Sequence, residues 1–431
     1  MSIRFLPLLT LVLCAVVSAP ARAQTATVEH ARGVTIIRQQ DPAATLVHVS
    51  FILRAGLDRE TLAQNGLAAL TAQTVLRAPV DGTSLREAIA ARGGSIQAFV
   101  DPSDVRFAIE ALPASANDIF ALAARGIAAP SFDAKTVDAA REGLIAQIAQ
   151  NQQQALRVGL DMLYATRTSS ANTGLPSLGI PAALAQFGPR DVRAFYRTYY
   201  RSGGSIISGV GRLDVLSAGA LERLASRLAS GSTAAVSVTL PKLEGTSHQL
   251  VARRDVAAPW LIAQYPAPAV GSKDFGAMLV LATFMQRTLS DMAEVPGVVS
   301  PTFASNSVGA LYDYSHQPAS LTLYVNGGMG NPDRAFGTAL SVANVLATTK
   351  LTGSIEDFKA MAYGDFATSA TTLESRAWLA TIFAEQVASP DYIARAMQAI
   401  AATTPADIQR VAKRYLDKPT IALVLPRQQQ N

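Results

Sequence analysis

Residues 188–211 read GPRDVRAFYRTYYRSGGSIISGVG, and residues 404–426, in the other half of the chain, read TPADIQRVAKRYLDKPTIALVLP. Both stretches have a proline followed two residues later by an aspartate, which favours a helix start because the carboxylate meets the positive end of the helix dipole. Each helical pattern ends at an aromatic residue and leads through a turn into an apolar strand. Pro189 matches Pro405 and Asp191 matches Asp407, an offset of 216 residues in a chain of 431. An offset close to half the chain predicts a duplicated domain, because solenoid repeats recur every ~20–50 residues.

The duplication suggests where the domains begin and end. Residues 231–247 are rich in Ser, Thr, Gly and Pro, a composition typical of a linker or an exposed crossing. We therefore expect an N-terminal domain over residues 24–230 and a C-terminal domain over residues 248–427.

The first 23 residues have the pattern of a secretory signal peptide. Arg4 gives a basic start, a mostly apolar run follows, and Ala21-Arg22-Ala23 forms a small-x-small cleavage site before Gln24. The apolar run is shorter than the ~20 residues that a membrane span needs, so a retained anchor is the less favoured alternative. The sequence predicts a mature protein that is periplasmic or secreted and no longer attached to a membrane.

Composition excludes several kinds of chemistry. Hydrophobic residues make up 49% of the chain and charged residues 16%, which indicates large cores and little disorder. The one cysteine, Cys14, lies in the predicted signal peptide, so disulfides, thiolate zinc sites and cysteine nucleophiles are not expected. The net charge of +5 falls to +3 without Arg4 and Arg22. No Lys/Arg cluster points to nucleic acid as a partner.

Within each half, strands and helices are segregated. In residues 46–54, LVHVSFILR, apolar residues alternate with polar ones, which predicts a half-buried antiparallel strand. Residues 33–40 are expected to pair with it as a hairpin, and residues 95–112 to form two more strands. Residues 133–165 follow as a long helical pattern, with Val137, Leu144, Ile145 and Ile148 on one face. This segregation predicts two homologous α+β domains, each a mainly antiparallel sheet packed against helices.

The order of motifs in the N-terminal half resembles a known family. A strand is followed by AG…E…NGLA opening a helix, then RGGSIQAFVDPSDVRF, a long helix with ARE, and the stretch at residues 187–211. This series resembles the pitrilysin/insulinase (inverzincin) zinc peptidases, which include the mitochondrial processing peptidase and its bacterial two-domain relatives. The resemblance extends over nearly all of the chain after the signal peptide. It implies a pair of two-domain subunits that together enclose a peptide substrate.

The resemblance also implies where zinc would bind. Active members carry His-x-x-Glu-His on the helix that begins here at residues 66–68, and a second Glu on a later helix. The first His falls on Ala69, the Glu on Ala72, the second His on Gln73 and the later Glu on Gln147, or on Gln150 if a small insertion intervenes. Alanine has no donor atom and a neutral amide is a poor zinc ligand, so we expect neither a catalytic residue nor a zinc site in this chain.

Two other sets of residues bear on the function of the lost site. The histidines His30, His48, His248 and His316 are far apart in sequence, so a dispersed metal site is the less favoured reading. Relatives carry an Arg and a Tyr in the second domain that orient the substrate. These positions fall on Ala293 and Ser300, with Arg287 or Tyr312 as displaced alternatives.

The strand at Gln97, Ala98 and Phe99 is the predicted substrate-binding element. In the family the corresponding strand pairs with an extended peptide through main-chain groups, which needs no particular side chains. An ordinary edge strand is the simpler interpretation of the same residues.

These observations predict a non-catalytic subunit that pairs with a zinc-bearing homologue and binds peptides, with zinc held by the partner. A stand-alone periplasmic peptide-binding or chaperone-like homodimer is the alternative. An unrecognised hydrolase site has no support in the sequence beyond the resemblance.

Overall fold

The computed structural model describes residues 26–167, 174–232, 249–293, 307–315, 318–328, 331–348 and 354–427. The predicted signal peptide, His248, Ser300, His316 and residues 233–247 of the predicted linker lie outside these ranges. No helix of the described part is long and apolar enough to cross a membrane.

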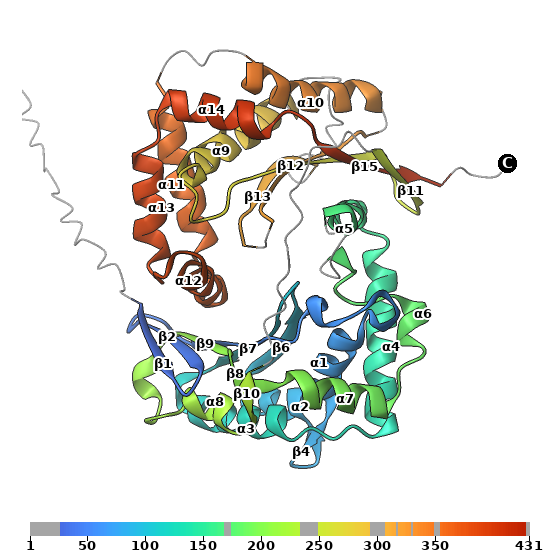
Figure 1. The fold of residues 1–431 in the computed structure, drawn as a ribbon, viewed down its shortest axis with the longest axis vertical. Coiled ribbons are helices and arrows are strands. Elements are labelled where there is room, and N and C mark those ends of the chain that lie inside the picture. Colours follow the sequence, from blue (N-terminus) through green and yellow to red (C-terminus); the bar gives the residue numbers. More distant parts are fainter. Residues whose placement is uncertain are drawn as a thin grey trace, which may run out of the picture.

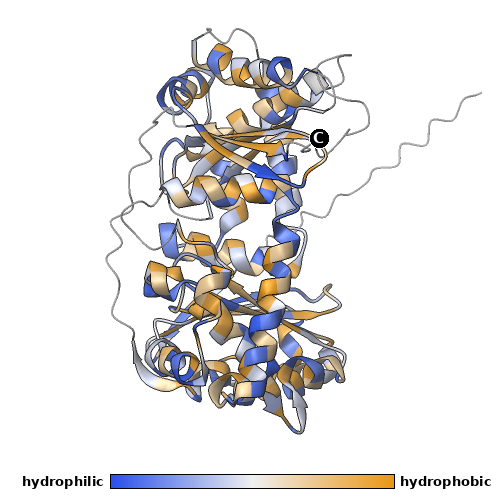
Figure 2. Cartoon of the chain, turned by 90° about the vertical axis from the view of Figure 1, so that its right-hand side faces the viewer, coloured by the Kyte–Doolittle hydropathy of each residue, from blue (hydrophilic) through white to orange (hydrophobic). Residues whose placement is uncertain are grey.

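Each half of the chain contains a sheet covered by helices, with hydrophobic residues concentrated on the strands and on the helix faces beside them (Figures 1 and 2). In the N-terminal half a six-stranded sheet has the order β1-β2-β9-β3-β7-β6. Its strands are β1 (Thr27–Ala31), β2 (Val34–Gln40), β3 (Val47–Leu53), β6 (Ser95–Val100), β7 (Val105–Ala111) and β9 (Ile206–Gly211). Its helices are α1 (Leu67–Arg77), α2 (Leu85–Ala90), α3 (Ala116–Ala128), α4 (Ala134–Asn151), α5 (Ala155–Arg167), α6 (Pro181–Leu184), α7 (Pro189–Tyr199) and α8 (Glu222–Ser226). Two short strand pairs complete it: β4 (Pro79–Val80) with β5 (Thr83–Ser84), and β8 (Arg201–Gly203) with β10 (Ala229–Ser232).

The C-terminal half repeats this plan with a five-stranded sheet in the order β11-β15-β12-β14-β13. Its strands are β11 (Gln249–Arg254), β12 (Trp260–Pro266), β13 (Val308–Asp313), β14 (Ser320–Asn326) and β15 (Thr420–Pro426). Its helices are α9 (Phe275–Ala293), α10 (Pro332–Thr348), α11 (Glu356–Ser369), α12 (Leu373–Val387), α13 (Tyr392–Ala401) and α14 (Pro405–Tyr415).

The stretches that reveal the duplication take equivalent places in the two sheets. β9 runs parallel to β2 and antiparallel to β3, just as β15 runs parallel to β11 and antiparallel to β12. The preceding helices start alike, because the amide N–H of Gly188 donates to Asp191 at 2.8 Å and that of Thr404 donates to Asp407 at 3.1 Å. The predicted pair of α+β domains is confirmed. β10 includes the first two residues of the predicted linker, and the domain boundaries stay predictions.

The two sheets face each other, and each is covered on its inner face by a helix of the other half (Figure 1). α12 packs on β9 and β3, and α5 packs on β15 and β12. Consequently all seven residues of β3 are buried, including His48 and Ser50, so the prediction of a half-buried strand is wrong. Its polar residues are accommodated by hydrogen bonds, such as that between His48 Nε2 and Ser50 Oγ at 3.0 Å.

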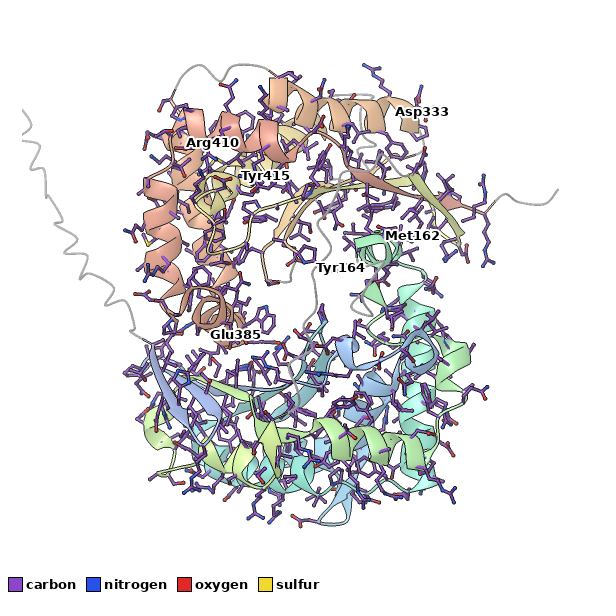
Figure 3. All side chains as sticks on the ribbon, in the orientation of Figure 1. Met162, Tyr164, Asp333, Glu385, Arg410 and Tyr415 are labelled. Atoms are coloured by element: carbon purple, nitrogen blue, oxygen red, sulfur yellow. The ribbon has the colours of Figure 1, made fainter. Side chains whose placement is uncertain are left out.

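Ion pairs join the halves along the edges of α12. Arg106 of β7 donates to Glu374 at 2.7 Å, and Arg376 donates to Asp41 at 2.7 Å. Arg54 pairs with Asp104 at 2.8 Å and also with Glu385 of α12, which lies beside the N-terminal sheet (Figure 3). These contacts fix the position of one half against the other.

The hairpin predicted for residues 33–40 and 46–54 is also wrong, because β9 lies between β2 and β3. The connection passes over the end of β9: the N–H of Asp41 donates to Gly211 at 2.8 Å, and that of Arg212 donates to Leu46 at 3.1 Å. Gly211 has φ +106°, and a Cβ there would lie 2.3 Å from the carbonyl oxygen of Leu46. A glycine is therefore required at the crossing. β2 instead forms a hairpin with β1.

The long helical pattern of residues 133–165 divides into α4, which packs against α1 of the N-terminal half, and α5, which lies above it against the C-terminal sheet (Figure 1). Val137 and Leu144 of α4 are buried as predicted, whereas Ile145 is 37% exposed and does not belong to the buried face. The break at residues 152–154 lets α5 leave the N-terminal half and pack on the C-terminal sheet.

Candidate functional site

The candidate site is built on α1, whose first turn is fixed by a buried carboxylate. Gly66 has φ +102° and precedes the helix. The Glu60 carboxylate accepts hydrogen bonds from the backbone N–H of Gly66 at 3.1 Å, the N–H of Ala68 at 2.6 Å and the side chain of Asn65 at 3.0 Å. These bonds satisfy amides that a helix leaves unpaired at its start. Burial nevertheless raises the pKa of Glu60 to about 7.

All four positions predicted to match the family's zinc ligands line one cavity of about 710 Å³. Ala69, Ala72 and Gln73 come from α1, and Gln147 comes from α4, which packs against α1. Gln150, the alternative position for the distal ligand, is not one of the lining residues. The remaining wall includes β6, the loop after it and the cavity-facing side of α5.

The residues present do not fit a zinc ion. Ala69 and Ala72 present only methyl groups, and the side-chain oxygen of Gln73 already accepts a hydrogen bond from Arg86 at 3.3 Å. Two aspartates line the same cavity, Asp101 and Asp161, and Asp161 is paired with Arg157 at 3.0 Å. Within the described ranges no group of three His, Cys, Asp or Glu side chains is placed to hold a metal. A tetrahedral zinc site needs three or four such donors.

The cavity instead contains guanidinium groups. Arg77 and Arg86 both line it, and a Cβ on Gly143 would lie 2.6 Å from Nη2 of Arg77. Gly143 is one helical turn before Gln147, so Arg77 reaches across α4 beside that residue. Burial and the nearby charge of Arg77 lower the pKa of Arg86.

The predicted substrate strand lies at the free edge of the N-terminal sheet. β6 is hydrogen-bonded to β7 and is last in the strand order. Gln97, Ala98 and Phe99 all line the cavity. The Phe99 ring also lies 4.3 Å from the guanidinium of Arg106, so one side of it is used in packing. Both the peptide-binding strand and the ordinary edge strand are compatible with this position.

The other candidate residues lie elsewhere. His30 on β1 bonds to Thr35 at 3.1 Å, and His48 is buried in β3. Arg287 pairs with Asp291 at 2.9 Å on α9. Tyr312 is buried and its hydroxyl donates to the carbonyl oxygen of Pro268. Arg287 and Tyr312, the displaced alternatives to the family's Arg and Tyr, do not line the cavity. Ala293 is the last residue of α9.

Three parts of the wall were not anticipated from the sequence. Arg77 follows Gln73 by four residues, so helical spacing alone places it on the same face of α1. Arg86 comes from α2 and Tyr164 from α5, and no local pattern joins them to α1. Tyr164 lies between the two halves, and its hydroxyl donates to Asp313 of β13 at 2.6 Å (Figure 3). The cavity therefore includes a residue that is bonded to the C-terminal sheet.

Comparisons with known proteins agree with this architecture. The sequence profile of the insulinase family (peptidase family M16) matches residues 35–179. No curated protein sequence matches the chain. Among solved structures, a protease from Helicobacter pylori superposes with a TM-score of 0.76 at 15% identity, covering 94% of this chain and 100% of that one.

Two further solved structures share the fold. A peptidase M16 inactive domain from Pseudomonas fluorescens has a TM-score of 0.76 at 15% identity and covers 94% of this chain and 99% of its own. A chain of Complex III2 from Candida albicans has a TM-score of 0.72 at 15% identity and covers 92% and 95%. The profile match identifies the family in the N-terminal half, and the superpositions extend its fold over both halves. Residues 35–179 match the insulinase family, peptidase family M16, and the described residues of the chain hold no group of three side chains placed to bind a metal.

Proposed function

We propose that this chain is the non-catalytic subunit of an exported zinc metallopeptidase, pairing with a zinc-bearing homologue to enclose and bind peptide substrates. The proposal is carried by one observation: the cavity lacks metal-binding side chains but still borders an edge strand on which a peptide can bind. Ala69, Ala72, Gln73 and Gln147 supply no metal site, whereas the cavity itself and the free edge of β6 beside it are kept.

Peptide binding by β6 needs only main-chain groups. A strand at a sheet edge has unpaired N–H and C=O groups, and an extended peptide can pair with them as an added strand. β6 is such a strand, and six consecutive residues from Gln97 to Pro102 line the cavity. Loss of zinc ligands therefore leaves this mode of binding possible.

A partner would supply the chemistry that this chain lacks. In the proposed pair, zinc is held by the homologue, and the present chain contributes the second wall of the chamber. The fold also occurs in a chain of Complex III2 from Candida albicans, which supports its use inside an assembly. Export is part of the proposal, because residues 1–23 have the signal-peptide pattern.

Co-purification tests the pairing. The chain, tagged at its C-terminus and expressed from its own locus, is gently extracted from its native host, and the bound proteins are quantified by mass spectrometry. We expect a stoichiometric homologue that carries His-x-x-Glu-His, and chelator-sensitive peptide cleavage by the pair but not by either chain alone. An unrelated exported protein with the same tag serves as the control. Recovery of this chain without such a homologue would refute the pairing.

One observation favours the alternative of a stand-alone peptide-binding module. Residues of this chain line a cavity of about 710 Å³ beside β6, which favours peptide binding by the chain itself. If the chain is recovered only with itself and still binds extended peptides, this second function replaces the first.

A further inference from the structure

Two arginines line the cavity without forming an ion pair to any residue that the structure describes. Among the residues that the structure describes, Arg77 has no ion pair, and its buried Nε has no hydrogen-bond partner. Arg86 donates to the neutral amide of Gln73 at 3.3 Å and likewise forms no ion pair. Arg157, the third arginine of the wall, is paired with Asp161 and also donates to Ser177 at 3.2 Å. Arg77 and Arg86 therefore differ from Arg157 in having no carboxylate partner.

These two arginines lie beside the predicted positions of the lost metal ligands. Arg86 is bonded to Gln73, and Arg77 lies against Gly143, one turn from Gln147. The pair thus stands beside two of the four positions at which the family's ligands would lie. Glu87, the acidic residue next to Arg86, is used mainly in capping α2, where its carboxylate accepts from the N–H of Ser84 at 3.1 Å. Its bonds to Ser84 and, less strongly, the charge of Arg77 lower its pKa, but it forms no ion pair with either arginine.

Unpaired guanidinium groups near each other are costly. Like charges repel, and an Nε–H without an acceptor loses the hydrogen bond it has in water. A carboxylate relieves both costs, since its two oxygens match the forked donors of arginine and its charge offsets theirs.

We propose that Arg77 and Arg86 bind a carboxylate of the peptide that this cavity takes up, so that the degenerate site selects acidic peptides. This inference rests on the proposed peptide binding. The carboxylate is either an Asp or Glu side chain or the peptide's own C-terminus. A peptide paired with β6 passes along the same wall, because Gln97 and Phe99 share the cavity with both arginines.

The test measures binding of matched, fluorescently labelled peptides to the mature chain by anisotropy. The peptides are extended and uncharged except at one position, which is Glu or Gln, and each is made with a C-terminal acid or amide. We expect the Glu or the acid form to bind about tenfold more tightly or better, the difference expected for a charge-assisted hydrogen bond. Whichever of the two changes matters identifies the source of the carboxylate.

Variants assign the effect to the two arginines. Arg86→Gln and Arg77→Gln should remove the preference. Arg77→Lys should keep only part of it, because lysine keeps the charge but lacks the forked donors. Arg86→Glu should shift the preference to a peptide with Lys at that position. Arg190→Gln is the control, because it makes the same change in net charge at an exposed residue of α7. Circular dichroism establishes that each variant is folded.

The outcomes separate the two proposals. Equal binding of Glu and Gln peptides and of acid and amide forms overturns the carboxylate site and leaves peptide binding intact. A preference that persists in both Gln variants also overturns it. If no peptide binds the chain or the purified pair, both proposals fail.

Discussion

Gly66→Ala should destabilise the protein much more than Gly82→Ala, although both glycines have left-handed backbones. Gly66 has φ +102° and Gly82 has φ +92°, so each alanine carries the same backbone cost of roughly 1–2 kcal/mol. Their surroundings differ. A Cβ at Gly66 would lie 2.9 Å from Cα of Gly179 and 2.8 Å from Cδ2 of Leu184, whereas a Cβ at Gly82 has nothing within 4 Å.

The contact at Gly66 adds a packing cost that Gly82 does not have. Overpacking a buried site typically costs about 1–3 kcal/mol. We therefore expect a loss of about 2–5 kcal/mol for Gly66→Ala and about 1–2 kcal/mol for Gly82→Ala. Because Gly66 opens α1, its substitution should also weaken peptide binding in the cavity, and Gly82→Ala should not.

Urea unfolding followed by circular dichroism measures both losses, with midpoints compared at a common slope. Equal losses for the two variants would refute the reasoning, since the only structural difference invoked is the contact with Gly179 and Leu184. A Gly66→Ala protein that is strongly destabilised but binds peptides as tightly as the parent would show that peptide binding does not depend on the start of α1.

Three more predictions follow from the structure. The pKa of Glu60 is raised to about 7 from an ordinary 4.5, so the folded state binds this proton more tightly than the unfolded state does. The free energy of unfolding should therefore fall by about 3 kcal/mol as the pH rises from 4.5 to 7. Urea unfolding at several pH values measures this fall, and Glu60→Gln should flatten it. Arg106→Met removes the bond to Glu374 and should lower the free energy of unfolding by about 1–3 kcal/mol. It should also shift the fluorescence of Trp378, whose ring lies 5.2 Å from the guanidinium. An unchanged spectrum and an unchanged stability would contradict the role given to this contact. A zinc site should be restored by four substitutions, Ala69→His, Ala72→Glu, Gln73→His and Gln147→Glu, and calorimetry would measure its affinity. Zinc should bind more tightly when Arg86 is also changed to Gln, because a cation is removed from the site. A substituted protein that binds no stoichiometric zinc would show that the backbone no longer fits the metal.

Much of the fold could be predicted from local patterns. The matching helix starts at Asp191 and Asp407 and the strands after them predicted a duplication, and the two sheets have equivalent connections. The resemblance to the family also implied that α1 carries the former ligand positions and that β6 borders the substrate site. These features depend on neighbouring residues in the sequence, so a single chain is enough to recognise them.

Burial was harder to predict, because it depends on what covers a surface. The alternation in β3 indicated one solvated face, yet α12 from the other half covers it and leaves His48 buried. The break between α4 and α5 was missed for a similar reason, since α5 gains its contacts on β15 and β12, far away in sequence.

The sequence by itself determined the duplication and the α+β class, because both follow from residue identity and from the local patterns of strands and helices. The absence of metal-binding side chains at residues 69, 72, 73 and 147 was implied by the resemblance to the family. Only the tertiary structure decided that β9 separates β2 from β3, that each half covers the other's sheet, and that Arg77 and Arg86 line the same cavity as Gln73 and Gln147. Those arrangements arise from contacts between segments that are distant along the chain, and such contacts leave no periodic pattern in the sequence.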